Sequence, residues 1–454
     1  MSNKGNSKDS IDFYLQKINS IEKQIISSVP NFDELLISQL KSYKDVKNQL
    51  SDNDVAIEFI FLPQVKMPIE HSQLLYGALI LTKNDDAPKL VLLCGDKELD
   101  EFIRFSQSNI NDLYSVKNKR LYEMVWQSIE PFIPEGANIY YSPTGDISKI
   151  NLSAISDGTS RLMDRFNIYE VSSTALIDKI RQSVTPQVHS AVIYGNIDYY
   201  TDTDTMAKIS SSYKLYSSEP LMATRSLYRN TWDLLPGTEK EIVQITDILK
   251  EKGIQVQLLS HSAANEESFK ALNACSPNII HIATHGFYFP NKKDAKSNFF
   301  SDLKSNTYND CHLFYSGLLF SGANNVWTGE KIATEVEDGI LTANEISHLD
   351  LSNVSLAVLS ACETGLGDIS KVDGVYGLQR GLKRAGVETI LMSLWKVDDE
   401  ATQILMVEFY RNLMSGKTKH QSLKDAQKHL RQVENGKYDD PKYWASFIML
   451  DGLN

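Results

Sequence analysis

The stretch Asn278-Ile-Ile-His-Ile-Ala-Thr-His-Gly-Phe287 decides the fold, together with Leu356-Ala-Val-Leu-Ser-Ala-Cys-Glu-Thr-Gly365. Each is a short apolar run that ends in a polar turn containing glycine, which is typical of a buried strand in a parallel sheet. Open parallel sheets carry their chemistry just beyond the carboxyl ends of their strands. One run ends at His285 and the other at Cys362. The two strand ends therefore supply the imidazole and the thiol that a cysteine nucleophile and its base require.

The composition is that of a globular protein, with 42% hydrophobic and 23% charged residues. A chain of 454 residues exceeds one typical core, so we expect two domains and an appendage. The net charge of -12 argues against nucleic-acid binding. No apolar run approaches the roughly 20 residues of a membrane span, and the first residues lack the apolar core of a signal peptide. We therefore expect a cytoplasmic protein without membrane contact.

The cysteines indicate neither a zinc site nor a disulfide framework. The four of them are widely spaced, and no two form a CxxC pair. A reducing cytoplasm fits this pattern and would keep a catalytic thiol usable. We expect no metal and no organic cofactor.

The first 190 residues divide into a helical arm, 1–50, and an α/β domain, 51–190. Apolar residues recur at helical spacing along the arm, which is either a docking arm for a partner or, as we favour, a helical hairpin packed on its own domain. In the domain, the pattern predicts a strand at 55–62, a hairpin of 76–82 with 89–94, and strands at 138–141 and 166–171. The ends of these strands carry no Cys/His pair.

From residue 191 onward, strands and helices alternate, which predicts a mostly parallel three-layer sandwich. The segment 199–231 is rich in Ser, Thr and Tyr and is expected to be an exposed loop, the easiest place for proteolysis. Thr238 is a candidate cap for the helix that follows it. The other expected elements are strands at 191–195, 254–259, 318–324, 388–395 and 443–450, and helices at 265–272, 374–385, 398–413 and 422–431, with a helix starting in 339–345.

Three blocks are specific enough to suggest a family. Ala283-Thr-His-Gly286, Ser360-Ala-Cys-Glu-Thr-Gly365 and Ser393-Leu-Trp-Lys-Val-Asp-Asp399 resemble the signature blocks of the CHAT family, caspase-like cysteine peptidases of clan CD that are related to separase. The resemblance covers roughly residues 50–454. It implies a three-layer α/β/α caspase-like sandwich with an N-terminal pseudo-caspase half (51–190) and a C-terminal active half (191–454).

Family members are often fused to tetratricopeptide repeats, whereas only about 50 residues precede the domain here. We therefore expect any partner recognition to come from the arm, from the inactive half or from a separate protein.

The resemblance also implies roles for individual residues. His285 matches the catalytic histidine and Cys362 the nucleophile, and the backbone N–H groups of Gly286 and Cys362 match the oxyanion hole. Glycine suits that task because its backbone can approach a substrate closely. A further segment resembles the one that pairs with the substrate as an added strand and walls its pockets; its residues are Ser393, Leu394 and Trp395.

Several side chains have a structural interpretation beside the functional one. Cysteine is among the most buried residue types, but the place of Cys362 after an apolar strand favours the nucleophile. His281 is interpreted as a buried, hydrogen-bonded packing residue rather than a second base. Glu363 would either orient the substrate or brace its loop. Asp398 would either form an acidic pocket for a basic P1 side chain or, as we favour, cap a helix. The P1 preference, basic or aliphatic, stays open.

The function predicted is that of a cysteine endopeptidase that cleaves one or a few protein substrates by a Cys-His dyad. The resemblance places it in bacterial defence or regulated cell death, with a gasdermin-like or CRISPR-associated protein as partner, and an activating partner protein is a further expectation. Two alternatives come from other classes: a non-catalytic scaffold of the same fold, and a different thiol enzyme such as an acyltransferase. The order of histidine before cysteine favours the peptidase.

Overall fold

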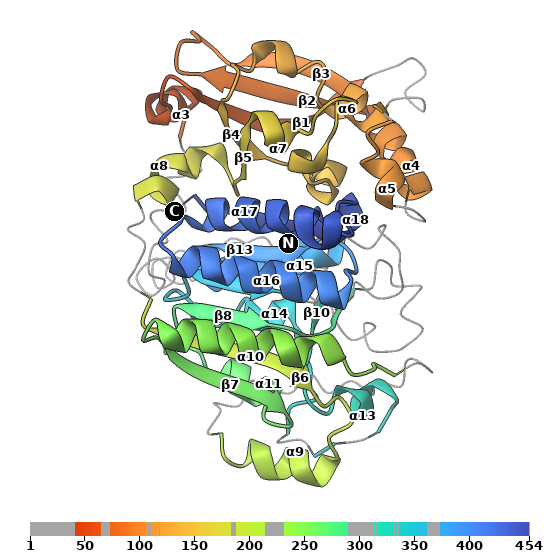
Figure 1. The fold of residues 1–454 in the computed structure, drawn as a ribbon, viewed down its shortest axis with the longest axis vertical. Helices are drawn as coiled ribbons and strands as arrows, with labels where there is room; N and C mark the ends of the chain where they lie inside the picture. The colour runs from red at the N-terminus through yellow and green to blue at the C-terminus, as the bar shows by residue number, and fades with distance from the viewer. Residues whose placement is uncertain are drawn as a thin grey trace, which may run out of the picture.

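The computed structural model describes residues 41–64, 73–106, 110–117, 119–182, 188–213, 231–288, 313, 316–330, 332–333, 336–360 and 373–453. Among these residues, eleven strands form one sheet, which Figure 1 shows stacked along the long axis of the molecule. In order across the sheet, they are β3 (Lys89–Gly95), β2 (Gln73–Thr82), β1 (Asp54–Gln64), β4 (Asn138–Ser142), β5 (Asn167–Glu170), β14 (Phe447–Leu450), β13 (Ile390–Ser393), β12 (Leu356–Leu359), β8 (Ile279–Ile282), β6 (Ser190–Ile197) and β7 (Gln255–His261). A second, three-stranded sheet consists of β9 (Gly286–Tyr288), β10 (Ser316–Leu319) and β11 (Ile340–Thr342).

The strand directions divide the large sheet into two halves. β1, β4, β5 and β14 run parallel to one another, and so do β13, β12, β8, β6 and β7. The two sets meet where β14 pairs antiparallel with β13. The carboxyl ends of the two sets therefore lie at opposite edges of the sheet. We name these the His285 edge, where β8, β12 and β13 end, and the Glu170 edge, where β5 and β14 end.

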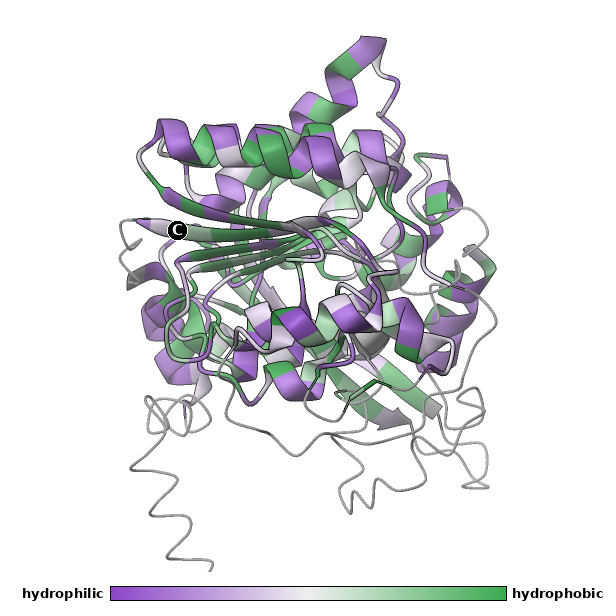
Figure 2. Cartoon of the chain, turned by 90° about the horizontal axis from the view of Figure 1, so that it is seen from below, coloured by the Kyte–Doolittle hydropathy of each residue, from purple (hydrophilic) through white to green (hydrophobic). Residues whose placement is uncertain are grey.

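Helices cover both faces of the sheet, as Figure 2 shows from below, which confirms the predicted three-layer α/β architecture. In the first half they are α3 (Tyr43–Gln49), α4 (Asp96–Phe105), α5 (Ile110–Leu113), α6 (Arg120–Val125), α7 (Leu162–Arg165) and α8 (Ile177–Gln182). In the second half they are α9 (Thr203–Ser210), α10 (Pro236–Glu251), α11 (Glu266–Lys270), α13 (Ala323–Trp327), α14 (Ala343–Ile346), α15 (Asp373–Arg384), α16 (Asp399–Met414), α17 (Lys419–Gln432) and α18 (Pro441–Trp444). Short 3-10 helices complete the described elements: η3 (Glu130–Phe132), η4 (Gly145–Lys149), η5 (Leu152–Ala154), η6 (Thr174–Leu176) and η9 (Val433–Asn435).

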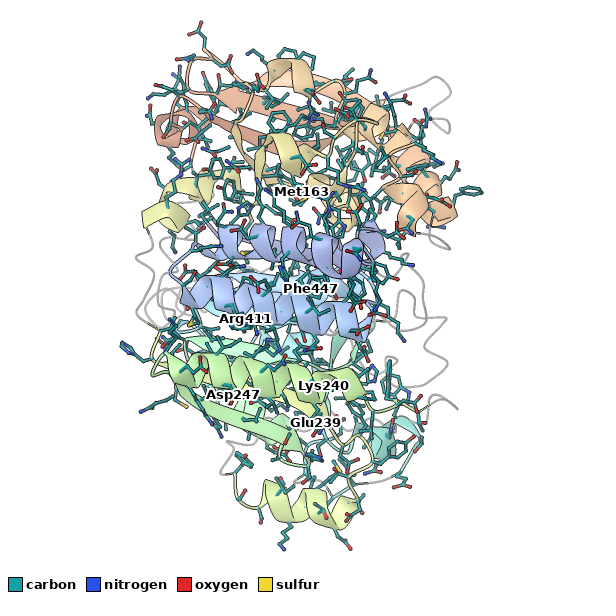
Figure 3. All side chains as sticks on the ribbon, in the orientation of Figure 1. Met163, Glu239, Lys240, Asp247, Arg411 and Phe447 are labelled. Carbon is teal, nitrogen blue, oxygen red and sulfur yellow. The ribbon has the colours of Figure 1, made fainter. Side chains whose placement is uncertain are left out.

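The helices on the front face of Figure 1 are amphipathic. Along α10, Ile242, Ile245 and Leu249 are buried at helical spacing. Its outer surface is charged, and Figure 3 labels Glu239, Lys240 and Asp247 there. α16 and α17 lie beside α10 on the same face, whereas α14 and α15 lie behind the sheet.

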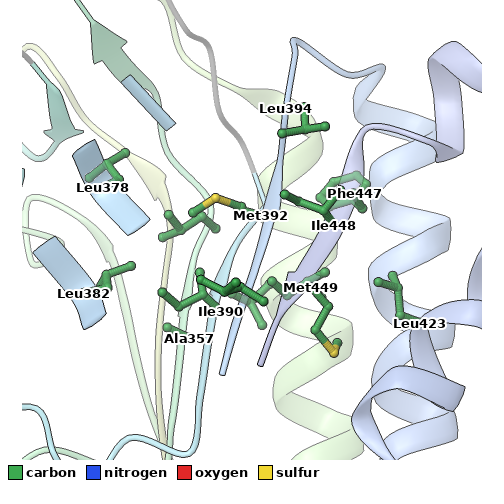
Figure 4. Packing of buried hydrophobic residues seen from close by; sticks show 14 of the residues in the cluster. Ala357, Leu378, Leu382, Ile390, Met392, Leu394, Leu423, Phe447, Ile448 and Met449 are labelled. Carbon is green, nitrogen blue, oxygen red and sulfur yellow. The ribbon is translucent and has the colours of Figure 1, made fainter. Parts of the chain in front are cut away.

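The central strands are buried throughout and mostly apolar because helices cover them on both faces. All four residues of β8, of β12 and of β13 are buried. Figure 4 shows Ile390 and Met392 of β13 near Leu378 and Leu382 of α15, while Met449 of the neighbouring β14 faces α17. The continuous core behind the two candidate strand ends holds them in fixed positions.

Most of the predicted strands are present, including the antiparallel hairpin of β2 and β3. The predicted loop 199–231 is partly wrong, because residues 203–210 form α9. Asp202 caps this helix by accepting a hydrogen bond from the Thr205 N–H at 2.9 Å. Residues 214–230 of that loop, like arm residues 1–40, lie outside the described part of the chain.

Four further predictions need correction. Thr238 does not cap α10 but lies inside it, and its hydroxyl donates back to the Leu235 carbonyl. The segment 318–324 leaves β10 after Leu319 and enters α13. Residues 339–345 split between β11 and α14, and 443–450 between α18 and β14. In each of these segments a short strand adjoins a helix, and periodicity cannot separate elements of four residues.

The division into domains at residue 190 stays a prediction, since β14 continues the sheet from one half into the other. Within the described residues, no helix combines the length and the apolar character that crossing a membrane requires.

Candidate active site

His285 lies just beyond the carboxyl end of β8. The strand ends at Ile282, three residues follow, the last of which is His285, and β9 begins at Gly286. The neighbouring β12 ends at the same edge, where the Ser360 N–H donates to the Ile282 carbonyl oxygen at 3.0 Å. β12 therefore ends beside the histidine strand, and the Ala-Cys-Glu block follows Ser360 in the sequence. Cys362 and Glu363 themselves lie outside the described residues.

The imidazole of His285 is buried, with 2% of the residue exposed. Its Nε2 lies 2.7 Å from the main-chain carbonyl oxygen of Asp233. A carbonyl oxygen can only accept a hydrogen bond, so Nε2 must carry the proton. In the neutral ring Nδ1 then holds the lone pair, and it is the nitrogen that can act as a base.

Two aromatic rings enclose this imidazole. The ring centroids of Tyr199 and Trp232 each lie 5.1 Å from that of His285. The Tyr199 hydroxyl lies 2.8 Å from Thr284 Oγ1 and accepts from the His285 N–H at 3.3 Å. Thr284 Oγ1 in turn donates to the Leu319 carbonyl oxygen. The histidine is thus held through its ring, its backbone and the residue before it.

The predicted substrate-binding residues lie at the same edge of the sheet. Ser393 ends β13 and is fully buried, and the Leu394 N–H donates to the Ser446 carbonyl oxygen at 2.8 Å. The Trp395 indole N–H donates to the Lys442 carbonyl oxygen at 3.1 Å, and its ring packs on Tyr114 of the first half. The segment is therefore held by hydrogen bonds to main-chain carbonyl oxygens.

Asp398 caps a helix, and Gly286 begins a strand. The Asp398 carboxylate accepts from the Ala401 N–H at 3.0 Å and caps α16, which is the interpretation that we favoured from the sequence. Gly286 opens β9, opposite Leu318 of β10. Roles of these residues in binding a substrate or an oxyanion stay predictions.

His281 is a separate, structural histidine. It is fully buried on β8, and its Nδ1 lies 3.3 Å from the Tyr410 hydroxyl. Its Nε2 lies 3.1 Å from Glu241 Oε1, but this second contact lacks the alignment of a hydrogen bond. Burial and the nearby Glu241 charge raise the pKa of Tyr410 well above its usual value. The group ties β8 to α10 and α16, in agreement with the packing role that we predicted.

One group of described carboxylates is close enough to hold a metal ion: Glu266, Glu337 and Glu345 have ligand oxygens within 4.8 Å of one another. The Lys270 ammonium, however, lies 2.8, 2.7 and 3.1 Å from these three carboxylates. Burial lowers the pKa of Lys270, but the negative charges outweigh this effect and hold the pKa well above its usual value. The lysine already provides the cation at this place.

The family follows from a comparison of the whole chain with models of protein families. The family model of the CHAT domain matches residues 117–452. The chain belongs to the CHAT domain family. The match begins just before α6, so β1–β3, α4 and α5 precede the matched CHAT domain although they continue its sheet.

Similar curated proteins are tetratricopeptide repeat proteins. The chain is 24% identical to tetratricopeptide repeat protein 28 of Homo sapiens over 298 residues, which covers 65% of this chain and 11% of the relative. It is 26% identical to the Mus musculus protein of the same name over 254 residues, covering 55% and 10%. The chain thus spans about a tenth of the length of these relatives.

Two solved structures resemble the chain in part. The Arg-specific cysteine proteinase gingipain R has a TM-score of 0.38 and 8% identity, over 78% of this chain and 74% of that one. The Saccharomyces cerevisiae separase–securin complex has a TM-score of 0.41 and 9% identity, over 90% of this chain and 30% of that one.

Some residues around the CHAT domain histidine could not be identified from the sequence. The Asp233 group that binds His285 is a main-chain carbonyl, which leaves no trace in residue type. Tyr199 is the first residue of the segment predicted as a loop, and Trp232 follows its last residue; their aromatic character was the available signal. Asn324, which contacts Trp232, had none.

Proposed function

We propose that this CHAT domain is a cysteine endopeptidase in which His285 and Cys362 act as a dyad. The observation that carries the proposal is the buried His285 imidazole, whose proton is fixed on Nε2 at the end of β8. The adjacent strand, β12, ends three residues before Cys362 in the sequence. Membership of a family whose signature blocks contain both residues supports the same assignment.

In the proposed reaction, His285 Nδ1 takes the proton of the Cys362 thiol, and the thiolate attacks the scissile carbonyl carbon. The tetrahedral intermediate collapses, His285 returns the proton to the leaving amine, and a thioester remains on Cys362. A water molecule then gives its proton to His285, attacks the thioester, and the carboxylic acid leaves as the thiol is restored. Backbone N–H groups of Gly286 and Cys362 are proposed to stabilise the oxyanion in both steps.

The substrate is proposed to be one or a few proteins rather than proteins in general. The segment Ser393–Trp395 would pair with an extended substrate, which restricts cleavage to sequences that fit as an added strand. We place the activity in bacterial defence or regulated cell death, acting on a gasdermin-like or CRISPR-associated partner and controlled by an activating protein. These finer assignments rest on the resemblance of the signature blocks.

The test compares the wild type with Cys362→Ala and His285→Ala. Each protein is incubated with a proteome from the source cell, and new N-termini are read by mass spectrometry. We expect discrete termini from the wild type, none from Cys362→Ala, and about 10²- to 10⁴-fold slower cleavage by His285→Ala. The residue before each new terminus identifies the P1 preference.

Equal termini from the wild type and both variants would contradict the proposal. The experiment is repeated with the genomic neighbours co-expressed, so that a chain that depends on a partner is distinguished from a scaffold. A peptide-based electrophile that spans several subsites separates a peptidase from an acyltransferase, because only the peptidase site binds the peptide on both sides of the electrophile.

A further inference from the structure

The main chain that orients His285 is itself held by one side chain, Asn324. The Asn324 Nδ2 donates to the Trp232 carbonyl oxygen at 3.0 Å, and its Oδ1 accepts from the Trp232 N–H at 2.8 Å. One amide thus binds both main-chain groups of Trp232, as a neighbouring strand would. Asp233, whose carbonyl oxygen accepts from His285 Nε2, is the next residue along the chain.

Asn324 also reaches the second wall of the imidazole. Its own N–H donates to the Tyr199 carbonyl oxygen at 3.0 Å. Tyr199 and Trp232 are the two residues whose rings lie 5.1 Å from the His285 ring. A single residue therefore fixes the main chain of both.

The fold places Asn324 rigidly. It lies in the first turn of α13 and is buried, with 2% of the residue exposed. The turn before it requires Gly322, whose φ is 78° and where a Cβ atom would lie 2.3 Å from Met206 Sδ. The Gly322 N–H donates to the Asp198 carbonyl oxygen at 3.0 Å, which joins α13 to the segment after β6.

We infer that Asn324 is a positioning residue for His285, which acts through the Trp232–Asp233 main chain. It holds the Asp233 carbonyl oxygen in line with Nε2 and so keeps the proton on that nitrogen and the lone pair on Nδ1. The segment 231–235 has no regular secondary structure. Without the Asn324 side chain, its main chain has one anchor fewer beside the His285 ring. The inference deepens the proposed function and rests on it for its catalytic meaning, but the tautomer it predicts is independent of any substrate.

The test uses full-length protein with ¹⁵N-labelled histidine and measures the protonation of each His285 nitrogen by NMR between pH 6 and pH 9. His285→Gln assigns the resonance. We expect the wild type to show one tautomer with the proton on Nε2. Asn324→Leu removes both hydrogen bonds, and Asn324→Asp keeps the acceptor while it loses the donor; both should show mixed tautomers.

The matched control is Asn325→Ala. Asn325 lies on the same helix, and its amide also donates to a main-chain carbonyl, that of Thr201, at 2.7 Å. This variant should keep the wild-type tautomer. The expected catalytic counterpart is a decrease of up to about 100-fold in kcat/KM for Asn324→Asp, mainly in kcat, because a misplaced base costs rate rather than substrate binding.

The outcomes separate the inference from the proposed function. An unchanged tautomer in folded Asn324→Asp or Asn324→Leu overturns the inference, whether or not activity decreases. Mixed tautomers in both, with Asn325→Ala unchanged, support it even if the wild type cleaves nothing. The rate at which iodoacetamide alkylates Cys362, read at the peptide level by mass spectrometry across the same pH range, reports whether the tautomer affects the thiol.

Discussion

The segments that follow the strands of the large sheet have different roles at its two edges. At the His285 edge, the segments that follow β6 and β8 bind one another around an imidazole. At the Glu170 edge, the segments that follow β5 and β14 close the seam between the halves, where Ser172 donates to the Asp451 carboxylate from its N–H and its hydroxyl. The sequence between Cys94 and His189 contains neither cysteine nor histidine.

The difference follows from strand direction. The parallel strands β1, β4 and β5 of the first half run opposite to β13, β12 and β8, so their carboxyl ends lie at the edge away from His285. The first half reaches the His285 edge through segments that precede these strands, as Tyr114 does when it packs on Trp395. We conclude that the first half supports the candidate site and that the carboxyl ends of β1, β4 and β5 are not placed to add chemistry to it.

The largest expected effect is at the carboxylate cluster around Lys270, in the second half. Lys270→Met removes the ammonium that contacts three carboxylates, among them the fully buried Glu266. Breaking a buried ion pair on one side costs about 3–5 kcal/mol, so the free energy of unfolding should decrease by this amount in urea denaturation. The control is Lys437→Met, at an exposed pair with Glu400, which should change stability little. Equal effects in the two variants would contradict the role given to Lys270.

The next prediction concerns the Glu170 edge. Burial raises the pKa of Glu170 to about 7, although the Tyr141 hydroxyl donates to it at 2.8 Å, and Asp451 adds a second negative charge nearby. The native state therefore binds a proton that the unfolded chain has lost, and the free energy of unfolding falls as the pH rises from about 4.5 to about 7. The contribution is about 3 kcal/mol, from 1.36 kcal/mol for each pKa unit.

Glu170→Gln isolates this contribution. The difference in unfolding free energy, variant minus wild type, should rise by about 3 kcal/mol between pH 4 and pH 8. His420 lines the same small cavity, and burial lowers its pKa to about 4; it is present in both proteins, so its opposite pH dependence cancels in the difference. A difference that does not vary with pH would show that Glu170 is ionised in the folded protein.

A smaller effect is expected where the first half binds the start of β14. The Asn151 amide donates to the Ala445 and Phe447 carbonyl oxygens at 2.8 and 3.4 Å, and the residue is buried. Asn151→Ala should lower the free energy of unfolding by about 1–3 kcal/mol and leave the His285 tautomer unchanged. The control is Asn53→Ala, an exposed amide that donates to the Gly136 carbonyl oxygen. A change of tautomer in Asn151→Ala would contradict the separation of the seam from the imidazole.

The smallest effect separates the two interpretations of Asp398. Asp398→Ala should cost about 1 kcal/mol of stability, since it removes the cap of α16. Asp398→Asn keeps a capping side chain and should keep the stability. If Asp398→Asn also keeps the rate of cleavage after basic residues, the residue is a cap only; a selective loss of that rate would assign it to an acidic P1 pocket.

The sequence predicted best what depends on local pattern. The buried strands of the second half are continuous apolar runs, and the cap at Asp398 precedes a strongly apolar helix. The cap at Thr238 was mistaken because Leu235 and Pro236 begin α10 earlier, with the Thr238 hydroxyl directed back to Leu235.

The features that were not predicted depend on contacts between distant segments. Asn324 contacts Trp232, which is more than 90 residues away in the chain, and nothing in its neighbourhood marks it as different from Asn325. The reversal of strand direction at β14 was also hidden, because four apolar residues fit either direction.

The position of β14 has a consequence for synthesis on the ribosome. β5 ends at Glu170, and the strand that covers its edge pairs there through Leu450, about 280 residues later. At roughly 5–20 residues per second, the nascent chain exposes the unpaired backbone of β5 for roughly 15–60 seconds before β14 emerges. Nearly all of the second half is thus translated before β14 can cover β5, and for that interval the exposed edge can pair with other strands.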